Sequence, residues 1–220
     1  MRQSQLLGRS RLRGLLSDTR AAAREINHER HRFAELQGGA PVVVSAHQLF
    51  PTPPALARRL VGLAEIQPGH TVLEPSAGTG NLLRALGDDC QVQAVEINAA
   101  LCRELAKQWP TTCADFLQCG RELGEFDRVI MNPPFTRGSD IRHIRHALQF
   151  VKPGGRLVAL CMAGPRQRAA LSDAQEWIDL PAGSFQSEGT RVGTAMVVYD
   201  TDAGRATSRP DATQQRGRPA

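Results

Sequence analysis

The stretch "TVLEPSAGTGN" (residues 71–81) joins a short apolar segment to a glycine-containing turn. Val72 and Leu73 predict a buried strand, and Gly78 and Gly80 permit a tight turn where the backbone can approach a ligand. The next residues, "LLRALGD" (82–88), predict a helix whose first N–H groups face that turn. Two glycines alone also fit an ordinary strand-to-helix turn, so this stretch indicates the local fold but is only weak evidence for a ligand site.

Strands and helices alternate along the rest of the central sequence. Further strands are expected at 92–98, 111–117, 126–132 and 156–163, with helices over 48–66, 99–109 and 140–151. Two more strands, 176–185 and 191–200, flank "QSEGT" and predict a closing hairpin. This spacing predicts an α/β fold with a doubly wound, mainly parallel, Rossmann-like sheet and helices on both faces.

Charge divides the chain into three parts. Residues 1–36 carry eight Arg against four acids (+4), residues 203–220 carry four Arg against one acid (+3), and the middle is about −2. We therefore expect a basic helical arm over 1–40, one domain over 41–202 and a disordered basic tail over 203–220. Such arms suit binding to a polyanion without sequence readout, and they suit a solubilising role equally well.

Composition excludes several classes of protein. Five cysteines at irregular spacing form no CxxC pair, which argues against a disulfide framework and a zinc cluster. No apolar run is long enough to cross a bilayer, and the first residues make a poor secretion signal. These observations predict a cytoplasmic protein without a membrane partner.

The most specific motif is "RVIMNPPF" (128–135), in which an apolar strand ends in Asn-Pro-Pro-Phe. Two prolines stop a strand abruptly, because proline cannot donate to a sheet ladder. The turn then holds the amide of Asn132 beside the ring of Phe135 at the edge where ligands bind in this type of sheet. Glu96 and Asp115 end two neighbouring strands and lie at the same edge, as expected for groups that bind a ribose and an adenine.

The series "LEPSAGTGN", "VEIN", "ADF" and "NPPF" resembles the class I S-adenosylmethionine-dependent methyltransferases. Within them it is most similar to the amino-methylating branch that contains the DNA adenine methyltransferases. The match covers about residues 48–200, and "FPTPPALARRL" (50–60) resembles the segment of that branch that contacts the cofactor. The resemblance implies methyl transfer from S-adenosyl-L-methionine to the exocyclic amino group of adenine in DNA.

The resemblance also implies roles for individual residues. The methionine part of the cofactor would be surrounded by the glycine loop and the segment before it, its ribose would bind Glu96, and its adenine would bind Asp115 with Phe116 against the ring. The implied cofactor-binding residues are Thr52, Pro53, Glu74, Ser76, Ala77, Gly78, Gly80, Asn81, Glu96, Ile97, Asp115 and Phe116. The implied catalytic residues are Asn132, Pro133, Pro134 and Phe135.

Nucleic acid is the expected partner, DNA first and RNA as its alternative. Arg137, Arg142 and Arg145 directly follow the motif and are candidates for phosphate contacts, although they also fit a solvated helix face. His143 and His146 share a helix, but no carboxylate or cysteine completes a ligand set, so no metal is expected.

The chain has little room for a separate region that recognises a DNA sequence, so recognition is short, comes from a partner or restriction subunit, or is weak.

Two other readings of the function remain open. Methyltransferases of ribosomal RNA adenine and of protein glutamine also use Asn-Pro-Pro-aromatic. The chain could also be a non-catalytic accessory protein that binds a cofactor or nucleic acid, but the intact Asn-Pro-Pro-Phe motif at Asn132 argues against this reading.

Overall fold

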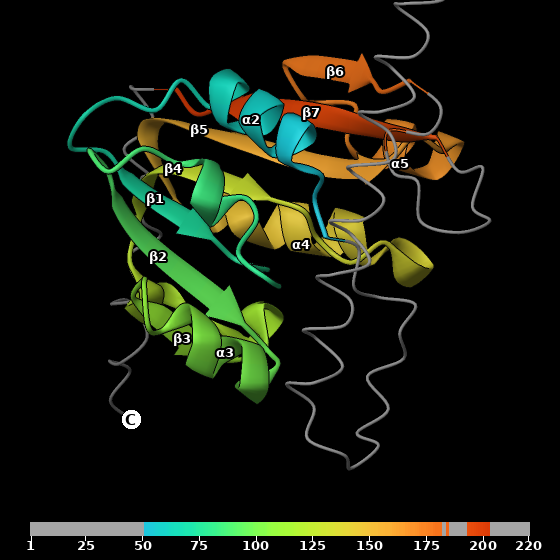
Figure 1. Ribbon diagram of the computed structural model, residues 1–220. Helices are drawn as coiled ribbons and strands as arrows, with labels where there is room; N and C mark the ends of the chain where they lie inside the picture. Colours follow the sequence, from blue (N-terminus) through green and yellow to red (C-terminus); the bar gives the residue numbers. More distant parts are fainter. Residues whose placement is uncertain (1–50, 182–183, 185–192, 203–220) are drawn as a thin grey trace, which may run out of the picture.

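Residues 51–181, 184 and 193–202 are described by a computed structural model of the chain (Figure 1). The basic arm, the tail and the "QSEGT" turn lie outside these residues, so the expected domain boundaries stay predictions. Within the described residues, seven strands form one sheet in the order β3-β2-β1-β4-β5-β7-β6. Their bounds are β1 Thr71–Glu74, β2 Gln91–Glu96, β3 Thr111–Cys113, β4 Phe126–Met131, β5 Val151–Met162, β6 Glu176–Asp179 and β7 Thr194–Asp200.

The pairing of these strands confirms the predicted fold class. Neighbours from β3 to β5 pair in parallel, whereas β7 runs antiparallel between β5 and β6. The sheet is therefore mainly parallel and ends in the expected antiparallel pair. Parallel strands bring their carboxyl ends to one edge, which gathers the loops that follow β1, β2, β3 and β4.

Four α-helices and five 3₁₀ turns connect the described strands. The helices are α2 Pro54–Leu63, α3 Ala99–Leu105, α4 Ser139–Ala147 and α5 Pro165–Ala170. The 3₁₀ turns are η1 Leu83–Ala85, η2 Phe116–Gln118, η3 Arg121–Leu123, η4 Thr136–Gly138 and η5 Leu148–Phe150. None of the helices in the described ranges has the length and hydrophobicity needed to span a bilayer.

Several elements differ from the sequence predictions. Strand β3 ends at Cys113 rather than at residue 117, and Phe116–Gln118 form the 3₁₀ turn η2. The helix expected over 82–88 is only the single turn η1, because "GDD" (87–89) follows after too few residues for a helix to propagate. Strand β5 begins at Val151 rather than at residue 156, with an irregular register beside β4. Helix α5 was not predicted; proline in its first turn marks its start.

The core lies on both faces of the sheet. Leu56, Ala57 and Leu60 of α2 pack against Ile130 on one face. Ile144 of α4 belongs to the cluster on the opposite face, together with alternate residues of β4 and β5. Figure 1 shows the sheet between α2 and α4, so the central strands are covered on both sides.

A carboxylate on β4 ties three strands together near their amino ends. Asp127 Oδ2 accepts hydrogen bonds from the backbone N–H of Thr71 (2.8 Å), the hydroxyl of Thr71 (2.7 Å) and Nζ of Lys152 (2.9 Å). Partial burial opposes ionisation of Asp127, but the bonds from Thr71 and Lys152 outweigh it and hold the pKa of this carboxyl well below its ordinary value. This contact fixes the stagger of β1, β4 and β5.

We expect Asp127→Ala to lower the free energy of unfolding by about 1–3 kcal/mol, because Thr71 and Lys152 lose their acceptor. Since the pKa of Asp127 is lower in the folded state, its contribution is full above about pH 4 and is lost as pH falls further through the folded value. Urea unfolding at pH 7 and pH 3 checks this against Asp88→Ala, which removes an exposed acid. Equal stability of the two variants at pH 7 would contradict it.

Candidate active site

The loop after β1 requires glycine at one position. Gly80 has φ +81°, and a Cβ there would lie 2.9 Å from Cδ2 of Leu105 and 3.3 Å from Trp109. Gly78 has φ +54°, and its backbone N–H points at a carboxylate of the next strand. The two glycines therefore have different roles. Gly80 allows the loop to pack closely against α3, and the backbone N–H of Gly78 donates a hydrogen bond to Glu96.

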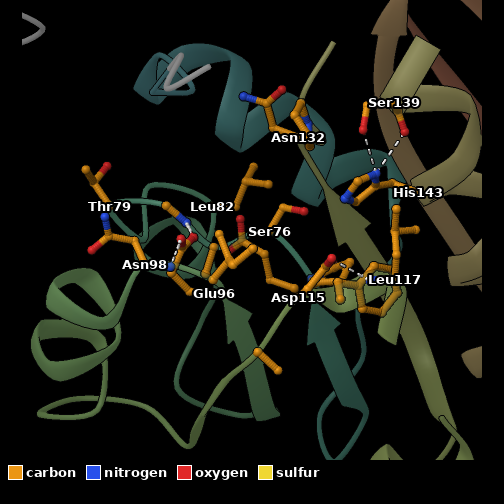
Figure 2. Close-up of a pocket in the computed structure, with 18 of the residues that line it drawn as sticks. Ser76, Thr79, Leu82, Glu96, Asn98, Asp115, Leu117, Asn132, Ser139 and His143 are labelled. Atoms are coloured by element: carbon orange, nitrogen blue, oxygen red, sulfur yellow. Dashed lines mark hydrogen bonds between the residues drawn. The ribbon is translucent and has the colours of Figure 1, made fainter. Parts of the chain in front are cut away.

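Glu96, the last residue of β2, holds that loop in place. Its Oε2 accepts from the N–H of Gly78 (2.7 Å) and its Oε1 from the N–H of Asn98 (2.8 Å), as drawn in Figure 2. Asn98 in turn caps α3 by accepting from the N–H groups of Ala100 and Leu101. Burial raises the pKa of Glu96 despite the bonds from Asn98 and Gly78, so this acid lies in a poorly solvated corner of the site.

Asp115 and Phe116 were expected at the end of the third strand, but β3 ends at Cys113 and both residues follow it. Asp115 is half-buried, whereas Phe116 is buried. Asp115 Oδ1 caps η2 by accepting from the N–H of Leu117 (3.0 Å). The ring of Phe116 is only 3% exposed and packs edge-on against His146, with ring centroids 4.8 Å apart, and against Phe150. Phe116 therefore borders the site mainly as part of its wall, which leaves little of its face for a ligand ring.

Asn132 at the end of β4 is held by the segment that precedes α2. Its Nδ2 donates to Oγ1 of Thr52 at 3.0 Å. The carbonyl of Thr52 accepts from Nδ2 of Asn81, also at 3.0 Å. Residues 80 positions apart in the sequence are thereby joined, and the orientation of the Asn132 carboxamide is tied to the glycine loop.

These loops enclose one pocket of about 1160 Å³. Most of the residues singled out from the sequence line it: Thr52, Glu74, Ser76, Ala77, Gly78, Asn81, Glu96, Ile97, Asp115, Phe116, Asn132, Pro134, Arg137 and Arg142. Figure 2 shows Glu96, Asp115 and Asn132 around the same space, although they lie at or just after the ends of three different strands. Most of the expected cofactor-binding residues and two of the four expected catalytic residues thus share a cavity.

Five candidates do not line the pocket: Pro53, Gly80, Pro133, Phe135 and Arg145. Pro133 is buried between two lining residues. Phe135 packs partly against the core on the α2 face, so in this structure it does not offer its ring to the pocket, contrary to expectation. Arg145 lies on the expected helix, but it forms an ion pair with Asp173 (2.7 Å) and donates to the carbonyl of Ala170.

His143 is a lining residue whose place the sequence reading missed. Its Nδ1 lies 2.8 Å from the carbonyl oxygen of Ser139, which can only accept, so Nδ1 carries the proton. The imidazole is largely buried, and burial lowers its pKa. Ser139 and His143 are four residues apart on a predicted helix, and this spacing could have indicated that the two side chains lie together beside the motif. His146 instead bonds the carbonyl of Cys119.

Glu74 is the most unusual ionisable residue of the pocket. It is 2% exposed, and its Oε2 has no hydrogen-bond partner among the described residues. Burial and, second, the nearby charge of Glu96 raise the pKa of Glu74 well above its ordinary value. A buried acid of this kind favours a ligand that brings positive charge.

Sequence comparisons find relatives among nucleic-acid methyltransferases. The chain is 30% identical over 139 residues to a tRNA (guanine(6)-N2)-methyltransferase of Thermus thermophilus, a match that covers 54% of this chain and 42% of that protein. It is 38% identical over 107 residues to the type II methyltransferase M.TthHB8I of the same species (46% and 24%). It is 36% identical over 98 residues to a dimethyladenosine transferase of Candida glabrata (40% and 30%). The matches thus span less than half of these relatives, and no family model matches the chain.

Solved structures confirm the class of fold. TrmN from Thermus thermophilus aligns with a TM-score of 0.54 and 25% identity over 68% of this chain and 49% of that one. The 23S rRNA methyltransferase ErmE, at 20% identity, aligns with a TM-score of 0.57 over 70% of each chain and shows the fold alone. The chain therefore has the Rossmann-like fold of class I methyltransferases. The comparisons do not single out the DNA adenine branch expected from the sequence.

S-adenosyl-L-methionine, the cofactor expected from the sequence, is the methyl donor of this class. The residues present fit it. The buried acid Glu74 suits a ligand that carries a sulfonium and an ammonium group. Ile97 lines the pocket yet stays 69% exposed, an apolar surface that a planar ring would cover.

We expect binding of S-adenosyl-L-methionine to release protons from Glu74. Burial raises the pKa of Glu74 in the free protein, and a bound cation favours the ionised form, so we expect affinity to rise with pH over the range in which free Glu74 is protonated. Isothermal titration calorimetry in buffers of different ionisation enthalpy measures the proton count. Glu74→Gln should release fewer protons and bind more weakly, and comparison with this variant cancels the cofactor's own titration. Equal proton release by both proteins would contradict the assignment.

Proposed function

We propose that the chain is an S-adenosyl-L-methionine-dependent methyltransferase that acts on the exocyclic amino group of adenine in DNA. The observation that supports this most strongly is the position of the Asn-Pro-Pro-Phe motif. Asn132 and Pro134 line the same pocket as Glu74, Glu96 and Asp115. A carboxamide beside a cofactor site suits a polar, planar nitrogen as the methyl acceptor.

The chemistry of such a nitrogen explains why an amide would be used. The lone pair of an exocyclic amine is delocalised into its ring and is a weak nucleophile. In our proposal, Oδ1 of Asn132 and the carbonyl of Pro133 accept its two N–H groups, which aims the lone pair at the methyl group and stabilises the positive charge that develops. The bond from Nδ2 of Asn132 to Thr52 supports this role, because it leaves the oxygen as the acceptor end of the carboxamide.

Little acid–base machinery is required. The bound cofactor supplies an activated methyl group on a sulfonium. The acceptor nitrogen becomes acidic as it is alkylated, so its proton can leave to solvent after transfer. The two prolines hold the backbone carbonyl of Pro133 in a fixed direction, because each proline fixes its own φ.

The relatives favour a nucleic acid as the substrate. Their names include a type II methyltransferase and a tRNA methyltransferase. A base in a duplex must be turned out of the stack to reach a pocket of this kind. The cavity of about 1160 Å³ is slightly larger than the roughly 300–1,000 Å³ typical of ligand pockets, in agreement with space for a cofactor and an extruded base.

Adenine in RNA is the second candidate. The similarity to a dimethyladenosine transferase favours it. The same pocket chemistry would serve, because adenine presents the same amino group in RNA and DNA. The choice between the two depends on how the strand is held outside the pocket.

Transfer of a tritiated methyl group from the cofactor to DNA, RNA or protein tests the proposal. We expect label in DNA, and we expect Asn132→Ala to reduce the rate about 10²–10³-fold, the usual cost of removing a positioned polar group of this kind. Gln149→Ala, a change at an exposed position after α4, is the matched control and should keep full activity. Label only in RNA would favour the second candidate. Label in no substrate, or full activity of Asn132→Ala, would contradict the proposed mechanism.

A further inference from the structure

The six arginines between Asn132 and Pro181 fall into two groups. Three form ion pairs with acids: Arg145 with Asp173 at 2.7 Å, Arg156 with Asp200 at 2.6 Å, and Arg168 with Asp179 at 2.6 Å. The other three, Arg137, Arg142 and Arg166, are exposed and have no acidic partner among the described residues. The positive charge of this region is thus neutralised at three positions and left available at the other three.

The three arginines without an acidic partner lie together beside the pocket. Arg137 and Arg142 line it. Arg166 comes from α5, but its guanidinium lies against Gly138, where a Cβ would be 2.7–2.9 Å from its Cζ and two nitrogens. Gly138 directly follows Arg137, so Arg166 reaches the same part of the rim from another element.

Buried hydrogen bonds fix the position of α5 next to this loop. Asp140, with 0% exposure, accepts from Nε2 of Gln167 at 3.0 Å and from the backbone N–H of Met162 at 3.0 Å. Gln167 is itself buried and is the immediate neighbour of Arg166. A carboxylate at the start of α4 therefore ties α4, β5 and α5 together, and Arg166 is placed against Gly138 by the fold rather than by a surface contact alone.

We infer that Arg137, Arg142 and Arg166 form a phosphate-binding rim that holds the phosphodiester backbone of a nucleic acid at the pocket mouth. Guanidinium groups bind phosphate with paired, charge-assisted hydrogen bonds, and such contacts position a strand without reading its sequence. The inference rests on the proposed function for the identity of the polymer. It replaces Arg145 of the sequence prediction with Arg166, because Arg145 is already paired with Asp173.

The test compares two arginines of the same helix in the full chain. Arg166→Gln and Arg168→Gln remove the same charge two residues apart, but Arg168 is paired with Asp179 and stacked on Trp177. Fluorescence anisotropy with labelled single-stranded DNA and RNA oligonucleotides measures Kd at several salt concentrations. We expect Arg166→Gln to raise Kd about tenfold, and to make the slope of log K against log salt shallower by about 0.7. Arg168→Gln should stay within about twofold of wild type, because its charge is already neutralised.

Several outcomes would overturn the rim. They are an unchanged Kd for Arg166→Gln, an equal loss for Arg168→Gln, no binding of either oligonucleotide by the wild type, or displacement of the oligonucleotide by polyglutamate as effectively as by unlabelled strand. Arg166→Lys should retain part of the affinity, which separates loss of charge from loss of fold, and thermal unfolding checks that both glutamine variants are folded. The DNA and RNA arms show which strand is held more tightly.

Binding of S-adenosyl-L-methionine, measured by calorimetry on the same proteins, separates this inference from the proposed function. We expect Arg166→Gln to bind the cofactor as the wild type does, because Arg166 lies outside the pocket lining. Absence of cofactor binding by the wild type would overturn the proposed function, and the oligonucleotide affinities would still test the arginine rim. Normal cofactor binding with no effect of Arg166→Gln on oligonucleotides would overturn the rim alone.

Discussion

One hydrogen bond, from Nδ2 of Asn132 to Oγ1 of Thr52, determines what the pocket can do. A carboxamide has a donor end and an acceptor end, and the two differ little in shape. With Nδ2 donating to Thr52, Oδ1 is the acceptor end of the carboxamide, and in our proposal it receives an N–H of the acceptor nitrogen. Because Thr52 also accepts from Asn81 through its carbonyl, the same contact links the end of β4 to the glycine loop after β1.

The sheet explains why residues so distant in sequence meet in one cavity. Strands β1 to β4 are parallel, so the loops after Glu74, Glu96 and Met131 open at the same edge. Acids buried at that edge are poorly solvated, which disfavours their ionised form and raises the pKa of Glu74. In our proposal the site combines poorly solvated acids beside a cationic methyl donor with an amide for a neutral nitrogen, and an arginine rim lies outside both.

Much of this could be predicted from the sequence, because the signals are local. Alternating strands and helices predict the sheet, and prolines directly after Asn132 predict where β4 ends. What could not be predicted depends on long-range packing. Phe135 turns to the core on the α2 face, Arg145 finds Asp173, and α5 carries Arg166 back to Gly138. No local pattern encodes these partners, because each pair is formed by elements that only the finished sheet brings together.

We propose that Thr52 orients the carboxamide of Asn132 for methyl transfer. The most direct test of this proposal is the steady-state rate of transfer by Thr52→Val, which keeps the side-chain shape but removes the hydroxyl acceptor, beside Thr52→Ser, which keeps the hydroxyl. We expect kcat to fall about 10–100-fold for the valine variant, with KM for the acceptor changed far less, and the serine variant to retain most of the wild-type kcat. Equal kcat for the valine and serine variants would contradict it.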